Sequence, residues 1–278
     1  MVHHGLSERR ACLLVGQHRS AQRYRGTVRS PDTALRNRLQ RFSEEHPRFG
    51  YRRAAATLRR EGHRVNDKRV HRIWRVMGLQ VPQRRRAWRH RGETANACHR
   101  RKAQHPNDVW AYDFVSDQTI DGRILKILAL VDEFTREPLA LFPARSIQAK
   151  DILTLLRTLF TRRGAPKAIR SDNGPEFVAQ ALQEFLEEQH VGTLFIAPGA
   201  PWENGIAESF NSRLRDELLD RELFVSLAEA KVILEKYRKH YIEERLHSSL
   251  GYRTPKEYIE HLEQTRSYPF NPNHATLS

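Results

Sequence analysis

The stretch IRSDNGPEFVAQ, residues 169–180, changes from apolar to polar within a few positions. Its first three residues have the character of the end of a buried strand, and Asp172-Asn173-Gly174-Pro175 follows directly. These four residues are favourable turn formers, because Asn and Gly adopt turn conformations and Pro fixes the backbone. The carboxyl end of a strand is also where α/β folds place ligands. The stretch therefore has two interpretations: a plain turn, or a strand end at which Asp172 is a metal ligand.

The segments around this stretch predict a mixed α/β sheet covered by helices. Strands are predicted within 109–120, 122–134, 137–146, 166–172 and 192–198, and helices at 149–164, 176–190 and 204–219. Asp121-Gly122 is a dipeptide typical of a hairpin turn. Asp117 and Asp121 are interpreted as turn residues, and Asp132-Glu133 as a strand end. Three strands in succession, followed by alternating helices and strands, indicate one sheet with helices on its faces.

Charge is distributed unevenly along the 278 residues, a length typical of about two domains. The whole chain has a formal net charge of +15. Residues 1–105 contain 27 Lys and Arg against 7 Asp and Glu, whereas the remainder contains 21 against 26. Such a basic segment favours a polyanionic partner such as nucleic acid. The second part must have a function that tolerates acidic groups.

The basic third contains a predicted helix-turn-helix. Helices are expected at 52–61, ended by Gly62, and from Asn66 to Met77, ended by Gly78. Two short helices joined by a tight turn are typical of this DNA-binding motif. The second helix carries the expected DNA contacts, Lys68, Arg69, Arg72 and Arg75. The alternative is a small helical domain with a solvated basic face.

Other N-terminal segments complete the predicted organisation. Two short helices broken near Gly16 are expected within 6–25, and another helix within 31–45. Residues 82–105 are basic and poorly periodic, which indicates a linker that contacts phosphates through Arg84, Arg85 and Arg86. The predicted domains are 1–30, 31–81, 82–105, 106–265 and the tail 266–278.

The composition excludes several classes of protein. Two cysteines, Cys12 and Cys98, cannot form a disulfide framework or a four-thiolate zinc site. No apolar run reaches the ~18 residues of a membrane span, and the N-terminus lacks the apolar core of a signal peptide. A reduced cytoplasmic protein with no membrane association is expected.

Two further acids accompany Asp172. Asp113 lies within an otherwise apolar strand, which is unfavourable unless the side chain faces a functional cleft. A third acid has to be chosen among Glu203, Glu208, Asp216 and Glu217.

Helix geometry favours Glu208. At about 100° per residue, Asn204, Asn211 and Arg215 fall within roughly 60° of Glu208, and the apolar residues fall on the opposite side. A carboxylate beside amides and a guanidinium suits a metal next to a phosphate. The alternative is an ordinary solvated helix face.

Together the three acids indicate metal-dependent phosphoryl chemistry. Mg²⁺ prefers oxygen ligands and uses few carboxylates. Nucleases and polymerases use two metals about 4 Å apart, on the attacking and leaving oxygens. Asp113 would then bridge the metals, and Asp172 and Glu208 would each complete one. No catalytic serine elbow, phosphate-binding Walker loop or dinucleotide glycine motif competes with this interpretation.

The motifs WAYDFVSD (110–117), IRSDNGPEF (169–177) and PWENGIAESFNSRLRDELL (201–219) resemble the core of retroviral integrases and bacterial insertion-sequence transposases. Asp172 and Glu208 are separated by 35 residues, which is the D,D-35-E spacing, and Arg215 follows seven residues after Glu208. HSSLGYRTPKEY (247–258) and the helix-turn-helix segment resemble the second-frame, OrfB-type product of an insertion sequence. Retroviral integrases have a His/Cys zinc domain, for which this chain lacks paired cysteines.

The resemblance implies an RNase H-like catalytic core preceded by an all-α helix-turn-helix region. Asp113, Asp172 and Glu208 would hold two Mg²⁺ ions, for which Mn²⁺ substitutes, and Arg215 would contact the element end. Asn173 and Gly174 would shape the turn after the strand, with Asn204 and Asn211 in support. Double-stranded DNA, a first-frame (OrfA-type) protein or fusion, and further copies of the chain on DNA are the implied partners, at the bacterial nucleoid.

Three functions remain open at this point. A DNA transposase uses every feature above. A non-catalytic regulator derived from a transposase needs the basic third but not three spaced carboxylates. A metal nuclease of the RNase H superfamily needs the carboxylates, but the helix-turn-helix favours a specific duplex end. His247 is expected either to contact DNA or to cap its loop.

Overall fold

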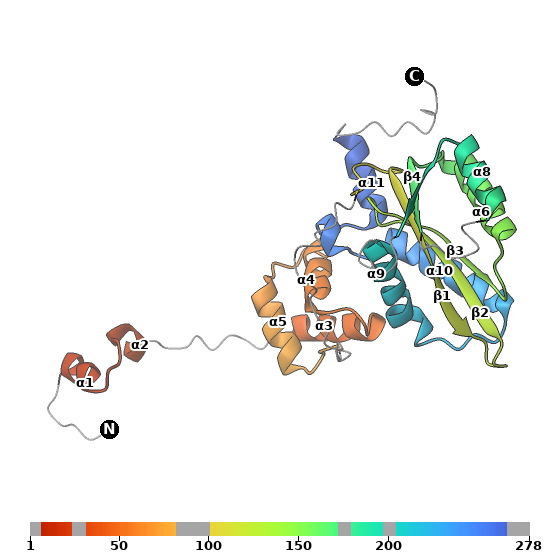
Figure 1. Cartoon of the computed structure of the whole chain (residues 1–278). Helices are drawn as coiled ribbons and strands as arrows, with labels where there is room; N and C mark the ends of the chain where they lie inside the picture. Colours follow the sequence, from red (N-terminus) through yellow and green to blue (C-terminus); the bar gives the residue numbers. More distant parts are fainter. Residues whose placement is uncertain (1–6, 24–31, 82–100, 172–178, 197–203, 266–278) are drawn as a thin grey trace.

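The computed structural model describes residues 7–23, 32–81, 101–171, 179–196 and 204–265, and its centre is a five-stranded mixed sheet (Figure 1). The strands are β1 (Val109–Gln118), β2 (Ile124–Asp132), β3 (Pro138–Ala144), β4 (Ala168–Ser171) and β5 (Gly192–Phe195). Their order is β3-β2-β1-β4-β5. β1 pairs antiparallel with β2 and parallel with β4, so it is the central strand.

Local sequence explains how the strands are joined. The β1–β2 hairpin closes where the Gly122 N–H donates to the Thr119 carbonyl (2.8 Å), and Gly122 has a φ of 75° that favours glycine. β4 and β5 run parallel to β1 and therefore need crossovers. Helix α6 (Ala149–Arg163) and helix α8 (Gln180–Glu188) lie in these connections.

Helices cover both faces of the sheet and divide its apolar residues into two clusters. On one face α6 and α8 pack on Trp110, Leu128 and Leu130. On the other face α9 (Gly205–Leu214) and α10 (Leu227–Glu243) pack on alternate residues of the same strands, such as Ile127 and Ala129. The alternation of side chains along a strand explains why one sequence supplies both clusters.

The helix-turn-helix has its own core. Helices α3 (Thr33–Glu45), α4 (Tyr51–Arg60) and α5 (Asp67–Val76) bury Leu39, Leu58 and Trp74 against one another. Asn66 caps α5, since its side chain accepts a hydrogen bond from the Arg69 N–H (2.7 Å). Two shorter helices, α1 (Glu8–Leu14) and α2 (Arg19–Arg23), precede it. The predicted helices of this region are confirmed.

The helix-turn-helix docks on the core through arginines. Arg48 forms an ion pair with Asp216, and Arg60 forms one with Glu257. The Nε of Arg53 donates to the Leu246 carbonyl at 3.1 Å. These contacts join α4 and Arg48, three residues before it, to segments 168 to 197 positions later in the chain.

Two details differ from the sequence-based expectations. Asp117 lies within β1, opposite Leu125, rather than in a turn, because the strands stay paired through Gln118 and the turn is formed by Thr119 to Gly122. The helix predicted for 204–219 changes at its end into a π-helical turn, Arg215–Leu219, in which the Asp220 N–H donates to the Arg215 carbonyl (2.9 Å). The last described elements are a short 3₁₀ turn (Ser248–Leu250) and α11 (Pro255–Gln264). Within the described residues, no helix combines the length and apolar character that crossing a membrane requires.

Candidate active site

Helix α9 lies along β1 through three hydrogen bonds from one stripe of its side chains. Asn204 donates to the Tyr112 carbonyl (3.4 Å), Asn211 to the Asp113 carboxylate (3.0 Å) and Arg215 to the Ser116 carbonyl (2.7 Å). Three consecutive turns of the helical run therefore face the central strand. The polar stripe predicted from the sequence is confirmed for these three residues.

Glu208 belongs to the same stripe, one turn after Asn204 and one turn before Asn211. Its side chain is exposed, as expected for a carboxylate at the rim of a site rather than in the core. It therefore extends from the α9 face that bonds to β1, the strand that carries Asp113.

Asp113 is half-buried and held in place from two directions. Its Oδ1 accepts the Phe114 N–H (2.8 Å) and its Oδ2 accepts the Asn211 side-chain N–H (3.0 Å). The amide oxygens of Asn204 and Asn211 are buried and have no hydrogen-bond partner among the described residues. Buried polar atoms without partners are uncommon in folded proteins and indicate an ion, water or strain. The middle of β1 therefore lies beside two amide oxygens that have no partner among the described residues.

Strand β4, which immediately precedes Asp172, is the parallel neighbour of β1. Ala111 and Arg170 are register partners, two residues before Asp113 and Asp172 respectively. Asp172, Asn173 and Gly174, and the alternative acid Glu203, lie outside the described residues. No group of three or more metal-binding His, Cys, Asp or Glu side chains occurs within the described ranges, which omit Asp172.

Comparison with known proteins identifies both the helix-turn-helix and the mixed-sheet core. Integrase core domain models match residues 103–201 and 189–255, and an HTH-like domain model matches residues 31–87. A 39.2 kDa protein of insertion element IS476 from Xanthomonas euvesicatoria is 38% identical over 98% of this chain and 79% of its own length. A 31.7 kDa protein of insertion element IS407 from Burkholderia multivorans is 37% identical over 95% of this chain and 94% of its own length.

The chain belongs to the insertion-element transposase family. It is a DNA transposase, a polynucleotidyl transferase with an integrase core and an HTH-like domain. Such a core implies the use of a divalent metal, and the two domain types indicate that the transposase binds DNA.

A solved structure supports the fold. The simian T-cell lymphotropic virus intasome in complex with a PP2A regulatory subunit has a chain that aligns with a TM-score of 0.52. The alignment covers 87% of this chain and 80% of that one at 17% identity. The RNase H-like, mixed-sheet class expected from the resemblance is confirmed.

Two other acids of the transposase core are engaged in contacts inside the fold. Glu133 forms a buried ion pair with Arg170 (2.7 Å). The buried Asp132 accepts three backbone N–H groups, from Asn107, Phe134 and Thr135; burial raises its pKa, against those hydrogen bonds. Asp132 is the last residue of β2 and Glu133 follows it, at the strand end that the sequence predicted, and their bonds indicate a structural role.

Glu217 was a candidate for the third acid, and the structure places it elsewhere. Both of its carboxylate oxygens accept hydrogen bonds from Arg245, at 2.5 and 2.7 Å, and one also accepts from the Tyr237 hydroxyl (3.1 Å). Burial favours a higher pKa for Glu217, but the bonds and charge of Arg245 outweigh burial and hold the pKa below its ordinary value. Asp216 is paired with Arg48. Asp216 therefore contacts the helix-turn-helix, and Glu217 contacts α10 and Arg245, two residues after it, rather than β1.

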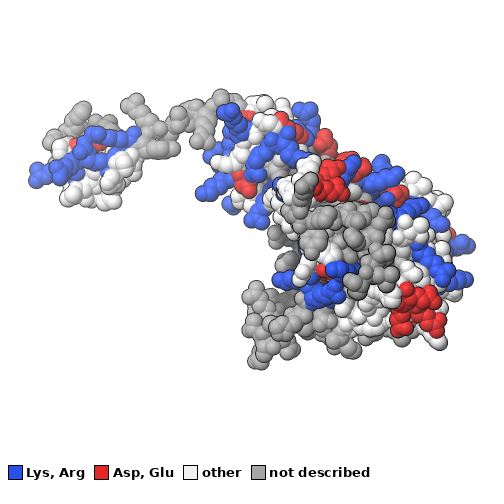
Figure 2. Space-filling model, turned by 90° about the horizontal axis from the view of Figure 1, so that it is seen from above, with Lys and Arg blue, Asp and Glu red and all other residues white. Residues whose placement is uncertain are grey.

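The basic helix of the helix-turn-helix has three exposed cations and one that is engaged. Lys68, Arg72 and Arg75 are exposed on α5. Arg69 instead donates to both oxygens of Asp32, at 3.2 and 2.5 Å, at the start of α3. Figure 2 shows Lys and Arg side chains spread over the N-terminal helices and the helix-turn-helix. Arg84, Arg85 and Arg86 lie outside the described residues.

The sequence-based interpretation missed the arginines of the domain junction. Arg53 and Arg245 both approach Glu217, at 3.6 and 2.5 Å. His247 is buried and contacts Arg245 (3.2 Å), so it orders its loop. The chain contains 48 Lys and Arg, and no local pattern distinguishes these two from the rest.

Proposed function

We propose that Asp113, Asp172 and Glu208 hold two Mg²⁺ ions and that this site cleaves the ends of the element and joins the freed 3′ ends to target DNA. The observation that carries the proposal is the Asn211 to Asp113 hydrogen bond (3.0 Å). It anchors the Glu208 stripe of α9 on the strand that carries Asp113, and Asp172 follows the neighbouring strand β4 in the sequence.

The donor atoms fit a hard divalent cation. Carboxylate and amide oxygens are what Mg²⁺ prefers in proteins, and Mn²⁺ accepts the same ligands. The buried amide oxygens of Asn204 and Asn211, without partners among the described residues, add further acceptors close to Asp113. His and Cys, which would favour zinc, are absent from this set.

The chain's own residues prepare the site. Asn211 and the Phe114 N–H fix the two oxygens of Asp113, so the carboxylate is oriented before DNA arrives. Arg215, held against β1, is proposed to contact DNA at the element end. When bound, the divalent ions would activate the attacking oxygen and stabilise charge on the leaving oxygen of an in-line displacement.

We assign the rest of the chain to binding and assembly. Lys68, Arg69, Arg72 and Arg75 of α5 and Arg84, Arg85 and Arg86 of the linker are proposed to contact DNA, and Asn173 and Gly174 to shape the turn beside Asp172. The proposed boundaries remain 1–30, 31–81, 82–105, 106–265 and 266–278. Because the reaction joins two ends to one target, the transposase is proposed to act as a homo-oligomer, with a first-frame protein or fusion, at the nucleoid in the bacterial cytoplasm.

The test is cleavage and joining of a labelled duplex that carries the element's own end, in Mg²⁺ or Mn²⁺. Wild type is compared with Asp113→Asn, Asp172→Asn and Glu208→Gln. We expect metal-dependent joining in the wild type and none in the variants, with DNA affinity retained in all four. Full activity in any one variant would remove that acid from the site. If the wild type only binds, the reaction is repeated with the frameshift fusion; continued inactivity would indicate a regulator.

A further inference from the structure

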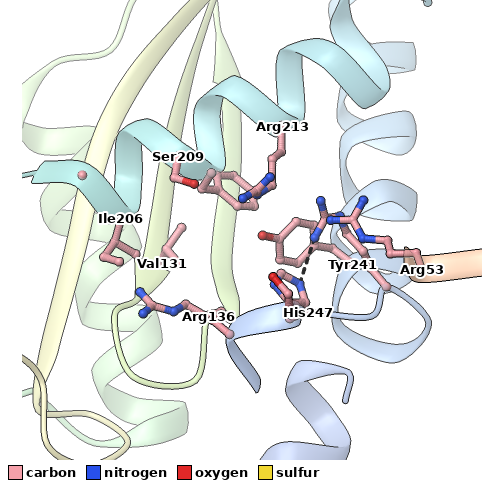
Figure 3. Close-up of a pocket in the computed structure, with 13 residues that line it drawn as sticks. Arg53, Val131, Arg136, Ile206, Ser209, Arg213, Tyr241 and His247 are labelled. Carbon is pink, nitrogen blue, oxygen red and sulfur yellow. Dashed lines mark hydrogen bonds between the residues drawn. The ribbon is translucent and has the colours of Figure 1, made fainter. Parts of the chain in front are cut away.

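A cavity of about 210 Å³ lies at the junction of the helix-turn-helix and the core (Figure 3). Its lining comes from α4, the end of β2 and the turn after it, α9, and the end of α10 with the segment that follows it. Four arginines and three serines line it: Arg53, Arg136, Arg213, Arg245, Ser209, Ser248 and Ser249. Asp113 and Glu208 are not part of this lining, so the cavity is separate from the candidate active site.

The cavity has an excess of positive charge. Among the described residues that line it there is no Asp or Glu. Glu217 lies behind the lining and pairs with Arg245 (2.5 Å) and Arg53 (3.6 Å), so two of the guanidinium groups share one carboxylate. Like charges gathered in a partly buried space repel one another, and an anion would relieve that repulsion.

The neighbouring titratable groups do not reduce this charge. Burial and the charge of Arg245 lower the pKa of Arg53 to about 10, which leaves it protonated at neutral pH. Burial and the surrounding arginines lower the pKa of His247 to about 2. Its neutral ring accepts a hydrogen bond from Arg245 Nη1 (3.2 Å) and so helps to orient that guanidinium.

The chemistry of the lining selects a phosphate group. Guanidinium forks match the oxygens of a phosphate, and serine hydroxyls donate to the same oxygens. The volume is below the ~300–1,000 Å³ of sites that enclose drug-sized ligands. A group of phosphate size fits better than a whole cofactor.

The position of the cavity identifies the source of that phosphate. On α9, Ser209 and Arg213 lie roughly 100–140° around the helix from Glu208, at about 100° per residue. Helix α9 therefore carries Glu208 on one face and the cavity residues Ser209 and Arg213 on the adjacent face. The opposite wall is Arg53, which belongs to the helix-turn-helix. A nucleic-acid strand that leaves this domain for the active site would cross the junction.

We propose that the cavity binds a backbone phosphate of the element DNA between the helix-turn-helix and the active site, with Arg213 as its exposed contact. This inference rests on the proposed DNA-joining function. Arg213 is exposed, so its replacement leaves the buried Arg245–Glu217 pair intact.

The test measures binding of the full chain to a fluorescent duplex of the element end over a series of NaCl concentrations. Wild type is compared with Arg213→Ala, Arg213→Lys and a matched control, Arg162→Ala, an exposed arginine of α6 on the other face of the sheet. Loss of one phosphate contact reduces the slope of log affinity against log salt by about 0.9. We expect this reduction in Arg213→Ala, and slopes close to wild type in Arg213→Lys and Arg162→Ala. Circular dichroism confirms equal folding.

A second readout locates the phosphate. Duplexes with one neutral methylphosphonate at successive positions should show a position that weakens wild-type binding but has no effect on Arg213→Ala. An unchanged salt slope, or the absence of such a position, would overturn the inference. The inference would also be overturned if inorganic phosphate raised the melting temperature of wild type but not of Arg213→Ala, while the two proteins bound DNA equally. The cavity would then bind free phosphate. A wild type that neither binds nor joins DNA would instead overturn the proposed function itself.

Discussion

Glu208 and Glu217 lie nine residues apart on one helical run, yet their surroundings are opposite. Glu208 is exposed and has no hydrogen bond or ion pair to other described residues. Glu217 has a side chain only 9% exposed and bonds to Arg245 and Tyr237. A buried acid whose oxygens are all engaged stabilises the fold, whereas an acid with available oxygens beside a functional strand is suited to chemistry. The type of residue does not distinguish these roles, but the partners do.

Replacing Glu208 by Gln, a residue of the same shape without the charge, should lower activity without lowering stability. Removing a metal ligand costs several kcal/mol of transition-state stabilisation, which corresponds to roughly 10³-fold or more in rate. Glu208→Gln should therefore lose strand joining by about this factor, measured in single-turnover assays. Its free energy of unfolding, from urea titration, should stay within ~0.5 kcal/mol of wild type, as is usual for an exposed site. A large loss of stability would mean that Glu208 also supports the fold.

Glu217→Gln should instead lower the stability of the folded chain. Breaking one partner of a buried ion pair costs about 3–5 kcal/mol, because Arg245 is left without its counter-charge. The loss is measured by urea titration of the full chain. Gln keeps the size of Glu, so the change reports charge rather than packing. An unfolding free energy equal to that of wild type would mean that solvent or another acid satisfies Arg245.

Asn211→Ala should give an intermediate effect on activity. Asn211 holds one oxygen of Asp113, the proposed metal ligand, and residues that orient metal ligands typically contribute 10–100-fold to activity or metal affinity. We expect joining to fall by about this factor, with part of the loss recovered at higher Mn²⁺ concentration. Ser212→Ala, an exposed neighbour on the same helix, is the matched control. Equal rates in both variants would show that Asp113 is oriented without Asn211.

Acid pH should produce the smallest and most gradual change. The pKa of Glu217 is lower in the folded state than its ordinary value of 4.5, so its stabilising contribution is complete above that value and is lost as the pH falls through the folded pKa. The difference in unfolding free energy between wild type and Glu217→Gln should be constant above about pH 5 and decrease below 4.5, by at most ~1.4 kcal/mol per pH unit.

Using this difference removes the opposing contribution of Asp132, whose pKa is raised by burial in both proteins. A difference that stays constant down to the acid transition would show that protonation of Glu217 does not weaken its contact with Arg245.

Much of the fold follows from local patterns in the sequence. The strands β1 to β3, the Gly122 hairpin and the Asn66 cap were all predicted, because apolar periodicity and turn chemistry act over a few residues. The polar stripe of α9 was predicted for the same reason. The π-helical turn at Arg215–Leu219 was not, since its local sequence continues a helical pattern; in the fold, Leu218 and Leu219 of this turn pack in the same cluster as α10.

The sequence by itself determined that the chain has a basic helical third, a mixed-sheet core, an acid within an apolar strand and a polar stripe on a later helix. Only the tertiary structure decided which acids are structural and where the two domains meet. Arg48 and Asp216 are 168 residues apart, and Arg53 reaches a carbonyl 193 residues away. Such pairs are chosen by shape and burial among 48 cations and 33 acids, and no short-range pattern encodes that choice.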